Sequence, residues 1–240
     1  MPDHDPLEHL PEDWTRGLAV VAHPDDMEYG AASAVARWTS QGKEISYLLA
    51  TRGEAGISSM SPEVVGPARE LEQRESCAVV GVTVVEFLDH ADGLVVPDLG
   101  LRRDLTAAIR RHRPEVVVTI NHRDDWGGPS WNHPDHRAVG RALLDSVRDA
   151  ANPWVFVGEG GAPWSGVRFA AINASPRATH AVEVTDTIEQ GVASLLCHRV
   201  YLENLDGDMA DAGAFIRDGA RREGARLGVE MATSFEVIPF

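Results

Sequence analysis

The decapeptide VAHPDDMEYG, residues 21–30, places one histidine and two adjacent aspartates directly after an apolar run. His23 and Asp26 are three residues apart, and on a helical turn or in a tight loop this spacing puts both side chains on one side. Asp25 must then point elsewhere. Because imidazoles and carboxylates are both metal ligands, this stretch can supply two ligands and one separate carboxylate.

The tetrapeptide HPDH, residues 133–136, repeats the pattern, with His133 and His136 at the same three-residue offset. Together the two segments offer enough side chains for a His₂-carboxylate site with an open position for water, which is typical of catalytic zinc. A second carboxylate in contact with that water could act as a general base. In the alternative interpretation each Asp only caps a helix, and each Pro takes the first helical position. Two His-Pro-Asp segments in one chain favour the chemical interpretation.

Strands that alternate with helices over residues 17–150 predict the sheet that positions these segments. We expect an α/β fold with a Rossmann-like, mainly parallel sheet flanked by helices. In such folds ligands bind beyond the carboxyl ends of the strands, near a topological switch point. Both histidine segments would therefore reach the same edge of the sheet.

The patterns define the expected elements by residue range. The expected strands are 17–22, 44–50, 82–88, 115–121, 154–158, 167–173 and 180–185. The expected helices are 30–41, 68–81, 104–113, 133–150 and 188–204, with a polar loop at 51–67 and an acidic stretch at the C-terminus. In helix 68–81 we expect Leu71 and Val80 to face the core, together with either Cys77 or Ala78. We expect residues 1–16 to form an extended lead-in and residues 17–240 to form a single domain.

Composition narrows the class of protein. The 240 residues carry a formal net charge of −15, with 43% hydrophobic residues. Such a surface repels phosphate backbones and anionic lipids, so neither nucleic acid nor membrane is an expected partner. No apolar run approaches the ~20 residues of a membrane span, and the N-terminus lacks the order of a signal peptide, so a cytoplasmic location is expected. Cys77 and Cys197 lie in apolar patterns and are expected to be buried thiols without a disulfide.

Three stretches, AHPDDMEYG, TRGEAG and HPDHRAVGRAL, resemble motifs of the PIG-L/LmbE-like zinc-dependent N-deacetylases. The resemblance covers about residues 17–205 and implies an LmbE-like fold. It implies that His23, Asp26 and His136 bind the zinc. It also implies that Asp25 is the general base, and that His133 stabilises the oxyanion or protonates the leaving amine.

The resemblance also implies supporting and substrate-binding residues. Asp135 would orient a neighbouring imidazole. Glu28 would support the loop that carries His23 and Asp26, called the metal loop below. Substrate contacts are implied for Arg52, Glu54, Arg69 (with Arg74 as its alternative), Asp92 and His198. Each of these also has a structural interpretation, as a loop ion pair, a solvated helix charge, a turn residue or a buried helix histidine.

The loop DDWGGPSW contains two tryptophans, Trp126 and Trp131, that could form a stacking wall for a sugar ring. Alternatively, they pin the loop to the surface. His122, which follows the fourth expected strand, could line the pocket.

These observations predict a metal-dependent hydrolase that removes an N-acetyl or other N-acyl group from an amino-sugar-type small molecule. Zn²⁺ is the expected cofactor, with Fe²⁺ as the alternative, and a homo-oligomer is expected from the resemblance. Two other functions stay open: an amidase acting on a thiol conjugate or another non-sugar amide, and a non-catalytic small-molecule-binding protein of the same fold. A dinucleotide-binding module is disfavoured because acids occupy the turn where a glycine-rich phosphate loop would lie.

Overall fold

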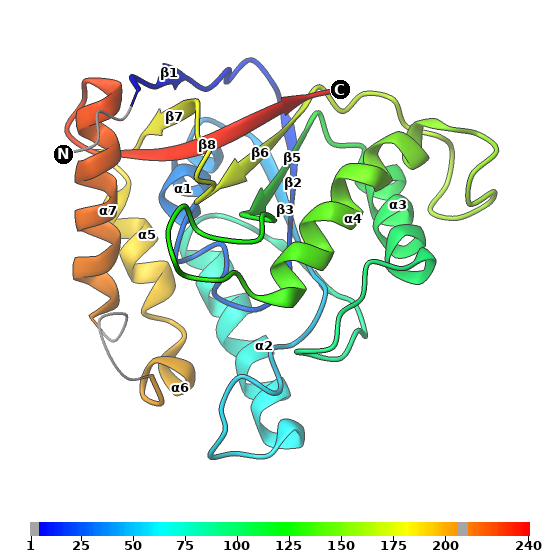
Figure 1. Cartoon of the computed structure of the whole chain (residues 1–240), viewed down its shortest axis with the longest axis horizontal. Helices are drawn as coiled ribbons and strands as arrows, with labels where there is room; N and C mark the ends of the chain where they lie inside the picture. Colours follow the sequence, from blue (N-terminus) through cyan, green and yellow to red (C-terminus); the bar gives the residue numbers. More distant parts are fainter. Residues whose placement is uncertain (1–4, 206–210) are drawn as a thin grey trace.

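The computed structural model describes residues 5–205 and 211–240, which form one eight-stranded sheet with helices on both faces (Figure 1). The strands are β1 (Glu8–His9), β2 (Arg16–Val21), β3 (Glu44–Leu49), β4 (Val84–Phe87), β5 (Val116–Ile120), β6 (Phe169–Asn173), β7 (His180–Glu183) and β8 (Ala232–Pro239). The helices are α1 (Ala32–Ser40), α2 (Pro62–Val79), α3 (Leu99–His112), α4 (Pro134–Ala151), α5 (Ile188–Leu195), α6 (Arg199–Leu202) and α7 (Ala212–Leu227).

The strand order, β1-β7-β8-β6-β5-β2-β3-β4, places β5 beside β2 although β3 and β4 intervene in the chain. β2 pairs in parallel with both β3 and β5, so the order of the strands reverses at β2. A reversal of this kind is the switch point at which open α/β sheets bind ligands. β8 is antiparallel to β6 and β7, whereas the other pairs are parallel, which confirms the mainly parallel sheet.

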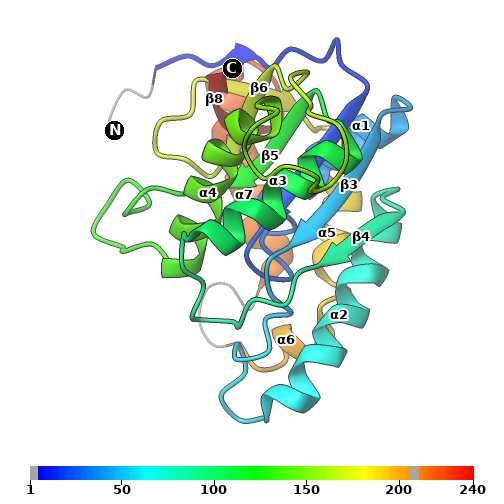
Figure 2. The ribbon, with the colours of Figure 1, turned by 90° about the vertical axis from the view of Figure 1, so that its right-hand side faces the viewer.

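Strand β2 is buried on both faces, as its unbroken apolar sequence predicted. Leu18 and Val20 belong to the core beneath α3 and α4, while Ala19 and Val21 belong to the core beneath α1, α5 and α7. These two groups of helices lie on opposite faces of the sheet (Figure 1). α2 and α6 contact each other and lie at the lower end of both views (Figure 2). The two cores fix the carboxyl ends of β2 and β5, from which the histidine segments lead away.

Helix α2 differs from its prediction in extent and in buried face. It begins at Pro62, so the expected loop 51–67 is wrong over its last six residues, and Pro67 lies inside the helix. Leu71 is 59% exposed, so it does not face the core as expected, whereas Val80 does and, of the alternatives Cys77 and Ala78, Cys77 is the buried one. Beside Val65 and Cys77, the buried face carries four buried polar side chains: Arg69, Glu72, Gln73 and Ser76. An apolar-periodicity argument cannot predict a helix that packs through its polar side.

Segment 154–158 is not a strand, and Trp154 and Val157 are exposed. The buried guanidinium of Arg110 donates to backbone carbonyls of this segment and its neighbours, including those of Val155, Phe156 and Glu159. The side chain therefore provides the hydrogen bonds that a neighbouring strand would have supplied.

The C-terminal third contains more structure than predicted. The expected helix 188–204 is two helices, α5 and α6, with His198 between them. The expected acidic stretch contains α7 and β8, and β8 pairs between β6 and β7. α3 begins at Leu99 rather than at residue 104, because the Asp98 side chain caps it by accepting from the Leu101 N–H.

The N-terminal lead-in contributes to the sheet, because β1 pairs in parallel with β7 and Trp14 is buried near Trp38. Both cysteines are free thiols, but only Cys77 is buried; Cys197 is partly exposed, contrary to expectation, because it lies after the end of α5. None of the helices in residues 5–205 and 211–240 combines the length and apolar character of a bilayer-spanning helix.

Candidate active site

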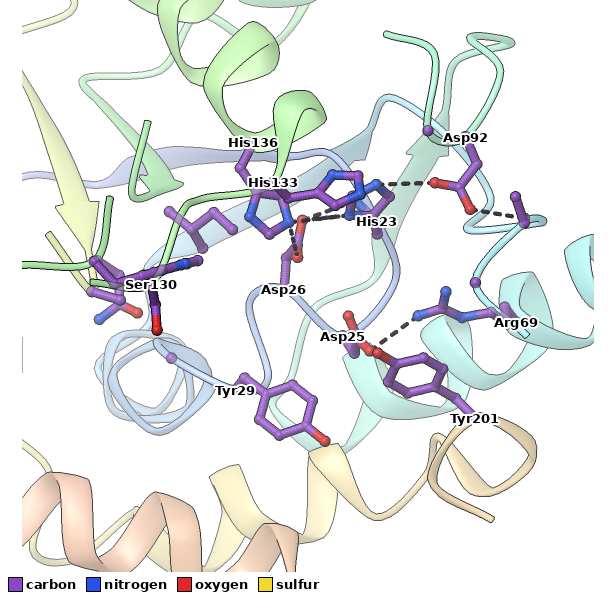
Figure 3. A pocket seen from close by; sticks show the side chains of 18 of the residues that line it. His23, Asp25, Asp26, Tyr29, Arg69, Asp92, Ser130, His133, His136 and Tyr201 are labelled. Carbon is purple, nitrogen blue, oxygen red and sulfur yellow. Dashed lines mark hydrogen bonds and ion pairs between the residues drawn. The ribbon is translucent and has the colours of Figure 1, made fainter. Parts of the chain in front are cut away.

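The two histidine segments meet at the switch point of the sheet. His23 and Asp26 follow β2, while His133 precedes α4 and His136 lies in its first turn. The ring centroids of His133 and His136 lie 4.9 and 5.1 Å from that of His23. Figure 3 shows these side chains grouped together with Asp26, with Asp25 close by. Segments far apart in the chain therefore share one crevice.

Three of these side chains form a triangle of donor atoms. His23 Nδ1 lies 3.2 Å from His136 Nε2. Oxygens of Asp26 lie 3.7 Å from His23 Nδ1 and 3.1 Å from His136 Nε2. Ligands bound tetrahedrally at about 2.0–2.1 Å from a zinc ion are roughly 3.3–3.5 Å apart, so the triangle has the right size for one ion. A ring nitrogen of His133 lies within 4.8 Å of ring nitrogens of His23 and His136, as a further potential ligand.

Hydrogen bonds on the far side of each ring determine which nitrogen carries the proton. His23 Nε2 lies 3.0 Å from Asp92 and 3.2 Å from Asp135, so it donates and Nδ1 keeps a lone pair. His136 Nδ1 lies 3.0 Å from Asn132 Oδ1, and the amide nitrogen of Asn132 donates to two backbone carbonyls. The Asn132 oxygen is therefore the acceptor, and His136 Nε2 also presents a lone pair.

A cation placed between these two ring nitrogens and the Asp26 carboxylate would satisfy all three groups. Burial opposes a charge on His23, yet the nearby Asp26 carboxylate and the hydrogen bonds that His23 Nε2–H donates to Asp135 and Asp92 raise the pKa of His23 well above its usual value. Burial likewise opposes a charge on Asp26, yet His136 and His23 lower the pKa of that carboxyl. The residues present thus stabilise positive charge at this point and fit a divalent ion.

A second donor group consists of His23, Asp92 and Asp135, whose ligand atoms also lie within 4.8 Å of one another. Both oxygens of Asp135 already accept backbone N–H groups, from Gly93 at 2.7 Å and Val95 at 3.2 Å. These bonds hold the carboxylate against His23. We therefore regard Asp135 and Asp92 as residues that orient this imidazole.

Asp25 stands apart from the triangle. Its backbone φ is +87°, so its side chain diverges from that of the adjacent Asp26. Arg69 Nη2 lies 3.0 Å from Asp25 Oδ2 and donates to the Pro24 carbonyl at 2.6 Å. Burial raises the pKa of Asp25 to about 7, although Arg69 opposes this shift. The sequence indicated that this carboxylate must point elsewhere, and it lines the same cavity as the triangle.

His133 has a different environment from the other two histidines. Its Nδ1 accepts the Asp135 N–H at 3.3 Å, which leaves Nε2 as the protonated nitrogen of a neutral ring. Burial, together with the nearby His23 and His136, lowers the pKa of His133. The ring is therefore neutral near pH 7 and offers one N–H donor.

The cavity above these groups has a volume of about 730 Å³ and a partly aromatic wall. Trp126 lines it, with its ring 6.0 Å from that of His136. Residues that sequence reasoning missed also line it: Tyr29, Ser130, Asn173, Tyr201 and Phe215. Tyr29 lies within the first histidine segment, so its position was the available signal. Phe215 lies on α7, which the sequence did not predict, so no signal pointed to it.

Several predicted substrate residues do not line this cavity. Arg52 binds Glu70 and Asp89. Glu54 accepts the backbone N–H groups of Arg52 and Asp92, so it ties two loops together. Both side chains are therefore engaged by the loops and by α2 rather than by the cavity.

Other predicted residues also lie elsewhere. Trp131 is 68% exposed and stacks on Arg137, with the guanidinium 5.1 Å from the ring centroid. Arg74, the alternative to Arg69, is half-exposed and binds Glu70. His122 lines a separate, polar cavity. Among all the substrate-binding residues that the sequence suggested, Arg69, Asp92 and Trp126 line the cavity.

His198 and Glu28 lie together beneath the metal loop. His198 is fully buried, with Nε2 3.8 Å from Glu28 Oε2, and does not line the cavity. Glu28 Oε1 accepts from Gln73 at 2.8 Å and from Ser76 at 2.8 Å. Burial raises the pKa of Glu28 to about 7. Glu28 thus connects the metal loop to α2.

The chain is similar in sequence to known deacetylases. The chain is 30% identical over 138 residues to the diacetylchitobiose deacetylase of Thermococcus kodakarensis, covering 57% of this chain and 50% of the relative. It is 30% identical over 189 residues to a 1D-myo-inositol 2-acetamido-2-deoxy-alpha-D-glucopyranoside deacetylase of Thermomonospora curvata, covering 68% of this chain and 61% of the relative. The chain thus spans about half to three fifths of the length of these relatives.

A solved structure matches over nearly the whole chain. The N,N'-diacetylchitobiose deacetylase of Pyrococcus horikoshii superposes with a TM-score of 0.84 and 26% identity, covering 95% of this chain and 85% of that protein. Residues 18–147, which include both histidine segments, match the PIG-L family, described as GlcNAc-PI de-N-acetylase. The chain therefore belongs to the PIG-L family.

Proposed function

We propose that the protein is a metal-dependent N-deacetylase that removes an acetyl group from a small N-acetylated amino sugar. The observation that carries the proposal is the triangle of His23 Nδ1, His136 Nε2 and the Asp26 carboxylate, with Asp25 facing the same cavity. In this proposal His23, Asp26 and His136 hold the metal, for which Zn²⁺ is the first candidate and Fe²⁺ the second. The names of the relatives given above describe deacetylases of N-acetylglucosamine-type compounds, which supports this substrate class.

A divalent ion held by the triangle would act as a Lewis acid, which polarises an amide carbonyl and makes a bound water easier to deprotonate. Asp25 is the general base, because it lies beside the triangle and is not one of its members. Arg69 keeps its carboxylate in place through the 3.0 Å ion pair. Asp25 removes a proton from the attacking water, and the protonated carboxyl can then pass that proton to the departing amine nitrogen.

His133 completes the proposed machinery. Its Nδ1 is engaged by the Asp135 N–H, so the Nε2–H group remains available. A neutral N–H donor at this point stabilises the negative oxygen that develops when the amide carbon becomes tetrahedral. Acetate and a free amine are the products.

The lining of the cavity favours an uncharged substrate body. Among the described residues that line it, Arg69 is the sole arginine and there is no lysine. Its guanidinium is occupied by Asp25 and by the carbonyls of Pro24 and Gly53. Aromatic walls at Tyr29, Trp126 and Phe215 provide flat apolar surfaces that suit the faces of sugar rings. A neutral N-acetylglucosaminide fits this lining better than a phosphorylated one.

The test is to measure bound metal and amine release in parallel, over neutral N-acetylglucosamine derivatives, their phosphates and a thiol-conjugated amide. We expect Asp26→Asn to lose the metal. Asp25→Asn should keep the metal and lose activity by roughly 10²–10⁴-fold. Asp89→Asn, which removes an exposed carboxylate, is the control. A fully metal-loaded protein that releases no amine from any of these compounds would indicate a binding protein instead.

A further inference from the structure

The backbone of Asp25 has an unusual conformation. Its φ of +87° lies in a region that residues with a side chain seldom occupy. Such a conformation persists only where the surrounding structure over-determines it, and it is often part of a functional device. What holds Asp25 therefore bears on how its carboxylate is aimed.

Helix α2 supplies the restraint through two residues one turn apart. Arg69 binds the carboxylate of Asp25 and the Pro24 carbonyl. Gln73, four residues further along the same face, accepts the backbone N–H of Asp25 through Oε1 at 3.1 Å. The carboxylate and the backbone of Asp25 are thus held by separate groups.

The amide of Gln73 has only one suitable orientation. Its Nε2 donates to Glu28 Oε1 at 2.8 Å and contacts Cys77 Sγ at 3.3 Å. Glu28 Oε1 also accepts from Ser76 Oγ at 2.8 Å, so it is itself fixed. The nitrogen end therefore faces Glu28 and the oxygen end faces Asp25. Gln73 is 1% exposed and does not line the cavity, so it does not touch the substrate.

We propose that Gln73 is a positioning residue for Asp25, because the pair Glu28–Gln73 holds the Asp25 backbone in the conformation that directs its carboxylate into the cavity. The proposal rests on the proposed function, in which Asp25 is the general base. It explains why a glutamine is buried on a helix face that could have been apolar. The position needs an acceptor toward Asp25 and a donor toward Glu28, and a glutamine side chain has both.

Three variants separate the two hydrogen bonds. Gln73→Met keeps the size of the side chain and removes both bonds. Gln73→Glu keeps the acceptor toward Asp25 but sets a carboxylate against Glu28. The double variant Glu28→Gln/Gln73→Glu reverses the pair: the amide introduced at position 28 donates to the carboxylate introduced at position 73, and that carboxylate also accepts the Asp25 N–H. Gln190→Met, on the exposed side of α5, is the matched control.

The measurements are kcat, KM, bound zinc and a crystal structure of each variant. We expect Gln73→Met and Gln73→Glu to lower kcat at least tenfold, with bound zinc unchanged and KM within about threefold of the parent. The double variant should recover most of kcat. In the crystal structures, φ of Asp25 should leave the positive region in Gln73→Met and return to it in the double variant.

Full activity of Gln73→Met, or equal kcat values for Gln73→Glu and the double variant, would overturn the proposal. If Gln73→Met does not fold, the comparison of Gln73→Glu with the double variant decides the question. The crystallographic result does not depend on any substrate. An Asp25 φ that stays positive in Gln73→Met therefore refutes the positioning role, whereas failure of the parent protein to release amine refutes only the proposed reaction.

Discussion

Removal of the Arg69 side chain provides the sharpest test of how the site is held together. The guanidinium is 3% exposed, pairs with the buried Asp25 at 3.0 Å and donates to the carbonyls of Pro24 and Gly53. Breaking a buried ion pair by removing one partner costs about 3–5 kcal/mol, because the other charge remains buried and unpaired. A domain of ordinary stability has about 5–15 kcal/mol in total. Arg69→Met should therefore lose a large part of the free energy of unfolding.

The assay is urea unfolding of the metal-free protein, with Arg74→Met as the control on the same helix. Arg74 is half-exposed and pairs with Glu70 four residues before it, so its loss should cost about 0–1 kcal/mol. The cost of Arg69→Met should fall when it is made in an Asp25→Asn background, because no charge is then left unpaired. If Arg69→Met cost no more than Arg74→Met, the buried pair could not be what holds Asp25, and the reasoning would be refuted.

The remaining predictions concern the cavity, the metal and a buried histidine. Phe215→Ala, at the aromatic wall, should raise KM for a neutral sugar substrate by roughly 5–30-fold through the loss of about 1–2 kcal/mol of contact, with bound metal unchanged; Trp154→Ala, at an exposed tryptophan outside the cavity, is the control. Chelation should lower the melting temperature, and zinc at about 100 times its Kd should restore about 2.7 kcal/mol; a thermal scan of Asp26→Asn that still responds to zinc would contradict the ligand assignment. Burial lowers the pKa of His198 to about 3, so the folded state keeps this ring neutral while the unfolded state takes up a proton below about pH 6.5. The contribution of His198 to the free energy of unfolding is therefore constant above pH 6.5 and falls by about 1.4 kcal/mol per pH unit toward pH 3. Denaturant unfolding of the parent protein and of His198→Gln from pH 7 to pH 4 should show this slope in the difference between their free energies of unfolding.

The sequence predicted the sheet edge that carries the site because local signals there agree with the fold. The apolar run before His23 becomes β2, which is buried on both faces, and the run before His122 becomes β5 beside it. His133 and Pro134 stand at the start of α4, as helix-start chemistry predicted. Parallel strands then bring the two histidine segments to one edge without further information.

The sequence could not predict which side chains would line the cavity. The tryptophans Trp126 and Trp131 are five residues apart in one loop, yet only the first lines the cavity. The ring centroid of Tyr201 lies 4.1 Å from the Arg69 guanidinium, and Phe215 reaches the cavity from α7. These positions depend on packing between elements that are remote in sequence, so no local pattern reports them.

Helix α2 shows why apolar periodicity did not reveal the residues that hold Asp25. A helix is usually placed by its apolar face, but the buried face of α2 carries Arg69 and Gln73, which serve Asp25. Leu71, on the same helix, is left exposed. Burial of charged and amide groups is costly unless each is paired, and here the partners are the backbone and carboxylate of the metal loop. The helix and the loop therefore depend on each other, and a sequence rule that treats each element alone misses the polar residues on the face that positions the proposed base.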